Sequence, residues 1–307
     1  MRNSSSQKQL VDTRFTIPHH LGSIALDHGE GDLCFLSHAH SDHINGIRRR
    51  EEIIASEETI SLAGLRARTH APEYTKLADA GHILGARQII VESDGKKSVY
   101  TGDLCLRENL ITKGAEIVSC DRLIIEATYA DPQYTFPPYR DVCDAMARWI
   151  VYHYNRGVNV LLGGYELGKS QELIRLVNEY CHVTPVVTEK MESFCEVYER
   201  FGVKLDRICI GSNEAEEVMK KQFIAIVPMR HAKRYFAHRL GEAFNRETVV
   251  SIATGWAMHY GFNVDQAFPL SDHADHTDLK EYIEQSGAKE VDFFAGDGSS
   301  LRKYIKR

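Results

Sequence analysis

The sequence has 307 residues, of which 43% are hydrophobic and 26% are charged, and its net charge is −6. These values are ordinary for a globular protein with one large domain or two intertwined ones. They exclude insertion into a membrane, because no apolar run approaches the roughly 20 residues that cross a bilayer. The negative charge gives no global attraction for nucleic acid, so a polyanion would need a local groove and bound metal ions.

The N-terminus and the cysteines bear on the compartment. Residues 1–9 are polar and lack the apolar core of a secretion signal, so we expect a frayed terminus. The seven cysteines form no C-x-x-C pair, and most lie in apolar or helical stretches such as residues 33–35, which predicts reduced thiols in the core. Together these features predict a cytoplasmic protein.

The N-terminal part of the chain holds three short predicted strands, at residues 14–17, 23–27 and 32–36. Asp27 ends the second of them. A carboxylate at this position could hold the ring N–H of a metal-binding histidine, and an ordinary turn aspartate is the alternative.

Residues 37–43 read Ser-His-Ala-His-Ser-Asp-His and follow the third strand directly. Three imidazoles and a carboxylate this close together favour a divalent cation such as Zn²⁺. His38 and His40 alternate onto one side of the strand end, whereas Asp42 and His43 fall in the following turn and can face a second ion. A surface histidine cluster or satisfied core histidines are the alternative, which the length of the motif disfavours.

Two further ligand-type residues come later, each beside a glycine. His82 lies in the loop 81–86, ahead of a predicted strand at residues 88–92, and Asp103 follows Gly102 at the end of the next strand. Either residue alone would most simply be structural. The order H-x-H-x-D-H, then G-H, then G-D is what indicates a metal site.

This order of motifs resembles the metallo-β-lactamase superfamily over roughly the first 105 residues. The resemblance implies two mixed sheets packed face to face with helices outside and the metals at the sheet edge. It also implies that His38, His40 and His82 hold one Zn²⁺, that Asp42 and His43 hold the other, and that Asp103 bridges them. A bridged pair activates a shared water and clamps the attacking and leaving oxygens, so hydrolysis is the expected reaction.

A second pattern begins near residue 121. A buried strand at 121–129 carries Glu126, and a helix is expected at 139–155. Further strands are predicted at 158–162, 185–188, 223–227 and 249–253, with helices at 168–180 and 189–201. This alternation is typical of a parallel sheet covered on both faces, so we predict a second α/β domain at 136–262, inserted between residues 1–135 and 263–307.

The chain ends with Ser271-Asp272-His273-Ala274-Asp275, a predicted helix at 277–285 and a predicted strand at 290–294. Glu126 in E-A-T-Y, the inserted domain and His273 in S-D-H-A-D resemble the β-CASP nucleases, the branch of the superfamily that cuts DNA or RNA. The resemblance implies a four-layer αββα fold with an inserted α/β domain, and a Glu126–His273 pair in which His273 protonates the leaving oxygen. His276 is the competing imidazole, which we interpret as a surface residue at the helix start.

One position departs from the family pattern. RNA-cutting members place another metal-binding histidine 22 residues after His273, where this sequence has Ala295. DNA-cutting members of the Artemis and crosslink-repair type carry an apolar residue there, so Ala295 favours DNA and weakens the second metal position. Asp297 is the alternative ligand.

Residues 164–170 follow a buried strand and open a helix, so their N–H groups and Lys169 suit a phosphate. They resemble the loop of DNA-type β-CASP nucleases near a terminal 5′-phosphate, which implies phosphate contacts from Gly164, Tyr165, Lys169 and Ser170. A plain helix start with an exposed lysine is the alternative.

Two other segments carry nucleic-acid hypotheses. Trp256, in a Gly-Trp pair after a strand, is a candidate platform for base stacking, with packing at a domain interface as the alternative. The basic residues 230–235 suit either phosphate contacts or a solvated helix face.

The sequence as a whole predicts a metal-dependent phosphodiesterase with Asp42, Asp103, Glu126 and His273 as catalytic residues. The expected cofactor is zinc, as one or two ions, with the second position weak or filled by Mn²⁺ or Mg²⁺. The expected substrate is single-stranded DNA, degraded from its 5′ end in DNA repair. The alternatives are an RNA-processing nuclease of the same fold, a small-molecule thioester or lactam hydrolase, which has no use for the inserted domain, and a non-catalytic scaffold, which would have lost metal ligands.

Overall fold

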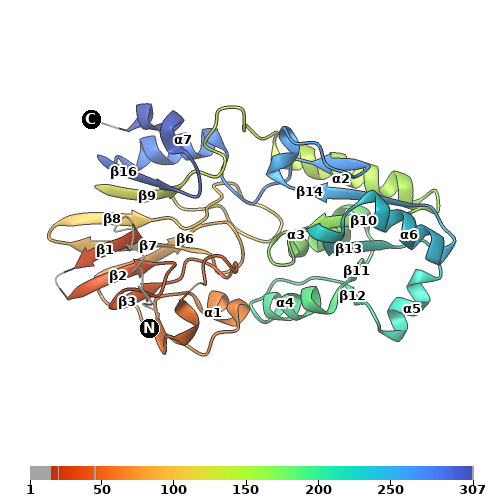
Figure 1. Cartoon of the computed structure of the whole chain (residues 1–307), viewed down its shortest axis with the longest axis horizontal. Coiled ribbons are helices and arrows are strands. Elements are labelled where there is room, and N and C mark those ends of the chain that lie inside the picture. The colour runs from red at the N-terminus through yellow and green to blue at the C-terminus, as the bar shows by residue number, and fades with distance from the viewer. Residues whose placement is uncertain (1–14, 20, 45, 306–307) are drawn as a thin grey trace, which may run out of the picture.

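The computed structural model describes residues 15–19, 21–44 and 46–305, and the predicted frayed terminus at residues 1–9 lies outside these ranges. Two lobes, each with its own sheet structure, lie side by side (Figure 1). The first lobe is built from both ends of the chain and the second from its middle. No helix within the described ranges is both long and apolar enough to span a membrane.

The first lobe contains two main sheets. One has the strand order β1-β2-β3, from Thr16–His19, Gly22–Leu26 and Leu33–Phe35. The other has the order β16-β9-β8-β7-β6, from Glu290–Phe294, Arg122–Glu126, Lys96–Tyr100, Arg87–Ser93 and Thr75–Asp79. The short strands β4 (Glu52–Ile53) and β5 (Arg68–Thr69) pair with each other beside β3.

Apolar residues alternate along these strands, so each sheet has one apolar face, and the two sheets pack against each other through these faces. Ile24 and Phe35 of the smaller sheet share one buried cluster with Ile89 and Tyr100 of the larger sheet. Helix α7 (His276–Ser286) covers the outer face of the larger sheet, and helix α1 (Glu57–Ala63) packs beside the smaller one. The layers therefore run helix, sheet, sheet, helix.

The second lobe is the predicted parallel sheet, with strand order β12-β11-β13-β10-β14-β15. Its strands are Ile208–Cys209, Val186–Val187, Ile224–Pro228, Asn159–Gly164, Thr248–Ala253 and Gln266–Phe268. Helices α2 (Tyr139–Tyr154), α3 (Lys169–Leu176) and α4 (Glu189–Arg200) pack on one face. Helices α5 (Asn213–Met219) and α6 (Arg234–Phe244) pack on the other. The mixed α/β class expected from the sequence is confirmed.

Several elements differ from the prediction. Strand β15 pairs with β14 as far as Phe268, so the parallel sheet continues beyond the predicted boundary at residue 262. The sequence also missed α6, whose capping residue Lys233 supplies no side-chain cap, and β12, which is only two residues long. Short strands and uncapped helices carry weak local signals, so tertiary packing decides them.

Candidate metal centre

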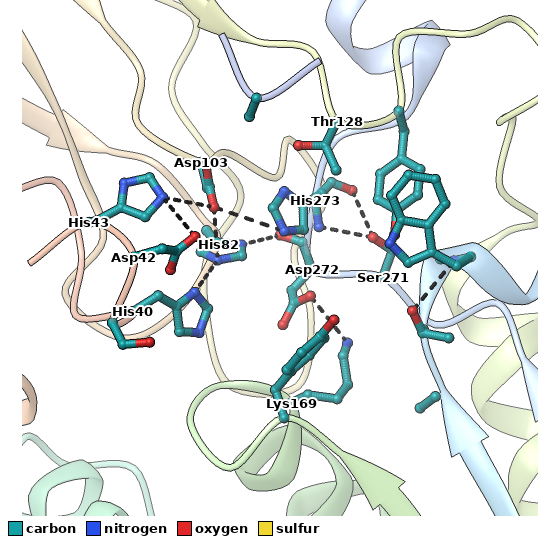
Figure 2. A pocket seen from close by; sticks show the side chains of 18 residues that line it. His40, Asp42, His43, His82, Asp103, Thr128, Lys169, Ser271, Asp272 and His273 are labelled. Carbon is teal, nitrogen blue, oxygen red and sulfur yellow. Dashed lines mark hydrogen bonds and ion pairs between the residues drawn. The ribbon is translucent and has the colours of Figure 1, made fainter. Parts of the chain in front are cut away.

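The predicted ligands meet at one edge of the first lobe, where it faces the inserted lobe (Figure 2). The loops after β3, before β7 and after β8 supply the histidine motif, His82 and Asp103 respectively. Gly102 makes the close approach possible: its φ is +55°, and a Cβ placed on it would lie 2.4 Å from the Cβ of Ser37. Only glycine fits there, so the turn before Asp103 depends on it.

Four donor atoms form a compact group. Nδ1 of His40 lies 3.0 Å from Nε2 of His38 and 3.1 Å from Nε2 of His82. Oδ2 of Asp103 lies 3.6 Å from Nε2 of His38 and 3.8 Å from Nε2 of His82. In a tetrahedral zinc site with bonds of about 2.0–2.1 Å, neighbouring donors lie roughly 3.3–3.4 Å apart. The observed spacing therefore fits a tetrahedral cation.

The protonation of these groups also suits a cation. Burial lowers the pKa of His38, His40 and His82, so their rings stay neutral and offer lone pairs at neutral pH. Burial and the neighbouring Glu126 raise the pKa of Asp103 to about 7. Oδ1 of Asp103 is buried without a hydrogen-bond partner, which is costly unless a bound ion satisfies it. The residues present thus fit a bound metal.

Backbone carbonyls of two other segments orient the rings. The remaining nitrogen of His40, Nε2, lies 3.2 Å from the carbonyl of Leu167, in the inserted lobe. The remaining nitrogen of His82, Nδ1, lies 2.8 Å from the carbonyl of Asp272. Because each ring N–H donates to a carbonyl, the other ring nitrogen is left as an acceptor that faces the donor group.

The second predicted metal position is less complete. Nε2 of His43 lies 3.6 Å from Oδ2 of Asp103 and 3.8 Å from Oδ2 of Asp42, whose side chain is 80% exposed. Burial alone would lower the pKa of His43, but the carboxylate of Asp27 at 2.7 Å raises it to about 9. A cation at this position must therefore compete with a proton on His43.

Asp27 lies at the centre of a hydrogen-bond network. Besides His43, its carboxylate accepts hydrogen bonds from the backbone N–H of Ser37 at 2.7 Å, the hydroxyl of Ser37 at 2.6 Å and the hydroxyl of Tyr100 at 2.8 Å. The sequence suggested the contact between Asp27 and a histidine. It gave no sign of Tyr100, because that residue comes from the facing sheet.

Glu126 and His273 form the pair that the β-CASP resemblance implies. Nδ1 of His273 donates to Oε2 of Glu126 at 2.9 Å, and Oε1 of this fully buried carboxylate accepts the N–H of Leu104. Burial would lower the pKa of His273, but Glu126 raises it to about 10. Nε2 of His273 lies 4.0 Å from Oδ2 of Asp103, beside the donor group.

A pocket opens from this centre toward the inserted lobe (Figure 2). His40, Asp42, His43 and His273 line it on one side. Three aromatic side chains, Tyr129, Tyr165 and Trp256, also line it. Trp256 also packs against Tyr129, with ring centroids 4.6 Å apart, so it is at once a pocket wall and a packing residue.

The phosphate-binding loop expected at residues 164–170 is not formed. The N–H of Gly168 donates to the side chain of Gln171, and the N–H and hydroxyl of Ser170 both donate to the carbonyl of Tyr165. Gly164 and Ser170 are buried away from the pocket, which only Tyr165 and Lys169 reach. The N–H groups of Gly168 and Ser170 are thus bonded within the segment, and Gly164 and Ser170 do not line the pocket, so both are removed from the phosphate contacts.

Lys169 is buried, contrary to the alternative of a plain helix start with an exposed lysine. Its ammonium group pairs with the buried carboxylate of Glu172 and lies 3.7 Å from Oδ1 of Asp272. Burial would raise the pKa of Asp272, but Lys169 lowers it. The charge of Lys169 is thus already neutralised, and it joins the inserted lobe to the segment that orients His82.

Three smaller expectations can be compared with the structure. Ala295 lines the pocket, whereas Asp297 is exposed and caps the segment Gly298–Tyr304, so it does not replace the missing ligand. His276 starts α7 as expected but is buried, because its Nδ1 bonds to the carbonyl of Ala130 at 2.6 Å. The interpretation of His276 as a surface residue was wrong.

Comparisons with known proteins address the family. No protein-family model matches the chain. The chain is 31% identical over 280 residues to a probable DNA ligase of Opitutus terrae, covering 84% of this chain and 26% of that protein. It is 29% identical over 157 residues to an RNase J-like protein of Methanocaldococcus jannaschii, covering 50% of this chain and 37% of that protein. It is 36% identical over 104 residues to the endoribonuclease ysh-1 of Neurospora crassa, covering 33% and 12%.

These relatives are much longer than the matched regions: the chain spans about a quarter of the first, somewhat more than a third of the second and about an eighth of the third. The chain belongs to the β-CASP nuclease branch of the metallo-β-lactamase superfamily. In this β-CASP protein the histidine motif, Asp103 and the Glu126–His273 pair lie in one site. The parallel sheet is inserted between β9, whose last residue is Glu126, and the loop before α7 that carries His273.

Proposed function

We propose that the protein is a zinc-dependent nuclease that hydrolyses phosphodiester bonds of single-stranded DNA from the 5′ end, in DNA repair. Its architecture would be the four-layer αββα fold, with a β-CASP domain inserted from residue 136 to Phe268. The observation that carries the proposal is the union of a four-donor cation site and the Glu126–His273 pair at one end of an aromatic-lined pocket.

The proposed roles follow from the geometry. His38, His40, His82 and Asp103 would hold one ion, and Asp42, His43 and the bridging Asp103 a second. Bound ions supply an activated water and offset the charge that builds on the phosphate. His273 keeps a proton because Glu126 stabilises its charged form, and its Nε2 faces the donor group, from which it would protonate the departing oxygen. Asp27 would hold the ring of His43.

Two observations support DNA over RNA. Ala295 occupies the position of the additional histidine of RNA-cutting members, and the relative that aligns with 84% of the chain is named a DNA ligase. RNA processing is the second candidate, because other relatives are named endoribonucleases and an RNase J-like protein. Tyr165 and Trp256 stay candidates for contact with the substrate, since both line the pocket.

A cytoplasmic location is also proposed. All seven cysteines are unpaired and five of them are buried. Their burial raises the pKa of several, including Cys105 and Cys143 to about 12, so these thiols are inert core residues suited to a reducing compartment.

The test is a side-by-side assay of end-labelled single-stranded DNA and RNA, with and without a 5′-phosphate, and of circular single-stranded DNA. We expect linear DNA to be shortened from its 5′ end, circular DNA to survive, and Asp103→Asn to abolish cutting. Faster cutting of RNA would favour the second candidate, and equal cutting of circular DNA would contradict the polarity. A protein without bound metal and without activity would be a scaffold.

A further inference from the structure

The inserted lobe presents exposed aromatic and basic side chains beside the pocket, on a surface that we name the aromatic–basic track. It consists of Arg230, Lys233, Tyr235, Phe236, Tyr260 and Phe262. The four aromatic side chains are 70%, 36%, 58% and 39% exposed, in chain order. They supply half of the large hydrophobic residues that are exposed in the described part of the chain. Such clustering on one surface indicates a binding role.

The track is continuous with the pocket. It lies on the segments that follow β13 and β14, the two strands that flank β10 in the sheet. The N–H of Arg234 donates to the carbonyl of Asn263 at 3.0 Å, which joins the two segments. At one end the rings of Tyr260 and the pocket residue Trp256 are 5.7 Å apart. At the other, Arg230 pairs with Glu166, next to the pocket residue Tyr165.

The charge of the track suits a polyanion. Residues 229–239 contain four arginines and lysines and no carboxylate, in a chain whose net charge is −6. Arg234 pairs with Asp265 and Arg239 with Glu242, so the candidates for phosphate contact are Arg230 and Lys233. Arg230 pairs with the carboxylate of Glu166 at 3.4 Å, but its own side chain is 65% exposed. An ion pair with an exposed partner is weak, and Glu166 also pairs with Lys190 at 2.8 Å, so a phosphate can replace Glu166 on Arg230. Lys233 has no ion pair among the residues that the structure describes.

The rings are held in place before any ligand binds. The hydroxyl of Tyr235 accepts a hydrogen bond from Arg239 at 3.1 Å, and the same guanidinium lies 6.0 Å from the ring centroid. Phe236 stacks on His231 with centroids 5.7 Å apart. An ordered exposed ring stacks on a base at little entropic cost, and only an unpaired base offers a free face.

We propose that the aromatic–basic track binds the single-stranded part of the DNA substrate beyond the pocket, with bases on Tyr235, Phe236 and Tyr260 and phosphates on Arg230 and Lys233. This inference rests on the proposed nuclease function. It resolves the two interpretations of residues 230–235 in favour of phosphate contacts. The proposal also predicts that long strands bind more tightly than short ones, because a short strand fills only the pocket and does not reach the track.

The experiment measures the binding of labelled strands to the full chain by fluorescence anisotropy. A chelator is present so that no strand is cut. The probes are fluorescein-labelled oligothymidines of about 6 and about 20 nucleotides, chosen to fill the pocket alone or the pocket and the track. A duplex of the longer length is a third probe. The variant is Tyr235→Ala/Phe236→Ala/Tyr260→Ala. The control is Tyr152→Ala, which removes a 58% exposed ring from α2, on the opposite face of the sheet from α6.

We expect the triple variant to bind the long strand at least ~10-fold more weakly than the wild type, since each stacked base contributes roughly that factor. Binding of the short strand and of the duplex stays unchanged, and Tyr152→Ala matches the wild type. If the triple variant binds the long strand as tightly as the wild type does, the proposal that the track binds DNA is wrong. The proposal is also wrong if the only defect of the triple variant is the loss of a dimer in sedimentation. The surface would then bind a second copy of the chain.

The outcomes separate the track from the proposed function. If the untreated protein cuts the short strand but the long strand binds no more tightly, the track alone is wrong. If neither strand binds and neither is cut, the proposed function is wrong and the track falls with it. A matched oligouridine arm reports whether the track distinguishes RNA from DNA; tight binding of RNA alone would overturn the proposal as stated.

Discussion

The two proposed halves of the candidate metal centre differ in donor spacing and in protonation. In the half formed by His38, His40, His82 and Asp103, neighbouring donor atoms lie 3.0 to 3.8 Å apart, and the three rings have lowered pKa values. In the half formed by Asp42 and His43, one carboxylate is largely exposed and the histidine has a raised pKa. At neutral pH the three rings of the first half are neutral and Asp103, with a pKa of about 7, is partly ionised, whereas His43 in the second half still holds its proton.

The anchors of the two halves explain this difference. Carbonyls of Leu167 and Asp272 orient the rings of His40 and His82, and Leu167 belongs to the inserted lobe. The ring of His43 is instead held by Asp27, a charged group that stabilises its proton. An uncharged anchor leaves a ring free for a metal, whereas an anionic anchor both orients the ring and makes it more basic.

The largest expected effect comes from the residue that both halves share. Asp103→Asn removes the charge that bridges the two positions, so we expect cutting to fall by more than ~1,000-fold, since bound metal supplies several kcal/mol of transition-state stabilisation. Metal content by atomic emission and cleavage of labelled DNA measure it. A variant that retains both metals and full activity would contradict the shared role.

The next effect tests the link between the first half and the inserted lobe. Lys169→Met leaves the buried carboxylates of Glu172 and Asp272 without their cation, so we expect a loss of about 3–5 kcal/mol in the free energy of unfolding. Urea denaturation measures it. Lys190→Met is the matched control, because Lys190 pairs with Glu166 while 61% exposed and should cost under about 1 kcal/mol. Equal losses in the free energy of unfolding for the two variants would show that the ion pairs of Lys169 do not stabilise the contact between the lobes.

The Glu126–His273 pair predicts a pH effect. With Glu126 present the pKa of His273 is about 10, so its proton is retained through neutral pH and lost only as the pH rises through that value. Glu126→Gln lowers this pKa, so we expect activity at about pH 8 to fall ~100-fold, with a smaller loss at about pH 6. A rate profile over pH measures it, and an equal loss at all pH values would indicate a purely structural role.

The smallest expected effect comes from adding a ligand to the second metal position. Ala295 faces the pocket with φ +56°, a conformation that histidine tolerates better than most residues. Ala295→His should therefore tighten the second metal by ~10-fold by adding a ligand. Calorimetry of the metal-free protein measures the change. Ala295→Asn, which suits the same backbone, is the control and should bind the second metal much as the wild type does.

The sequence predicted the local parts of the site better than the distant ones. The ligands in residues 37–43 share one short segment, so their spacing was informative. Glu126 and His273 were recognised through their family motifs. The burial of Lys169 was not predicted, because its partner Glu172 is only three residues away but its second partner, Asp272, lies far along the chain.

In the fold, too, elements with strong local signals were predicted better than elements that depend on distant contacts. The strongly periodic strands and helices of the parallel sheet were predicted within a few residues. Strand β15 was missed because it has only three residues and its pairing with β14 defines it. Helix α6 was missed although its sequence is amphipathic, because its start has no side-chain cap. The aromatic–basic track, which depends on α6, was therefore left undecided by the sequence.

The unequal halves are tested most directly by titrating metal into the metal-free protein at about pH 8, by calorimetry in buffers of different ionisation enthalpy. At this pH Asp103, with a pKa of about 7, is mostly ionised, whereas His43, with a pKa of about 9, is mostly protonated. We predict a tight first ion that releases few protons and a weaker second ion that releases about one proton, and whose affinity rises with pH toward 9. Two ions bound with equal affinity and no difference in proton release would contradict the account.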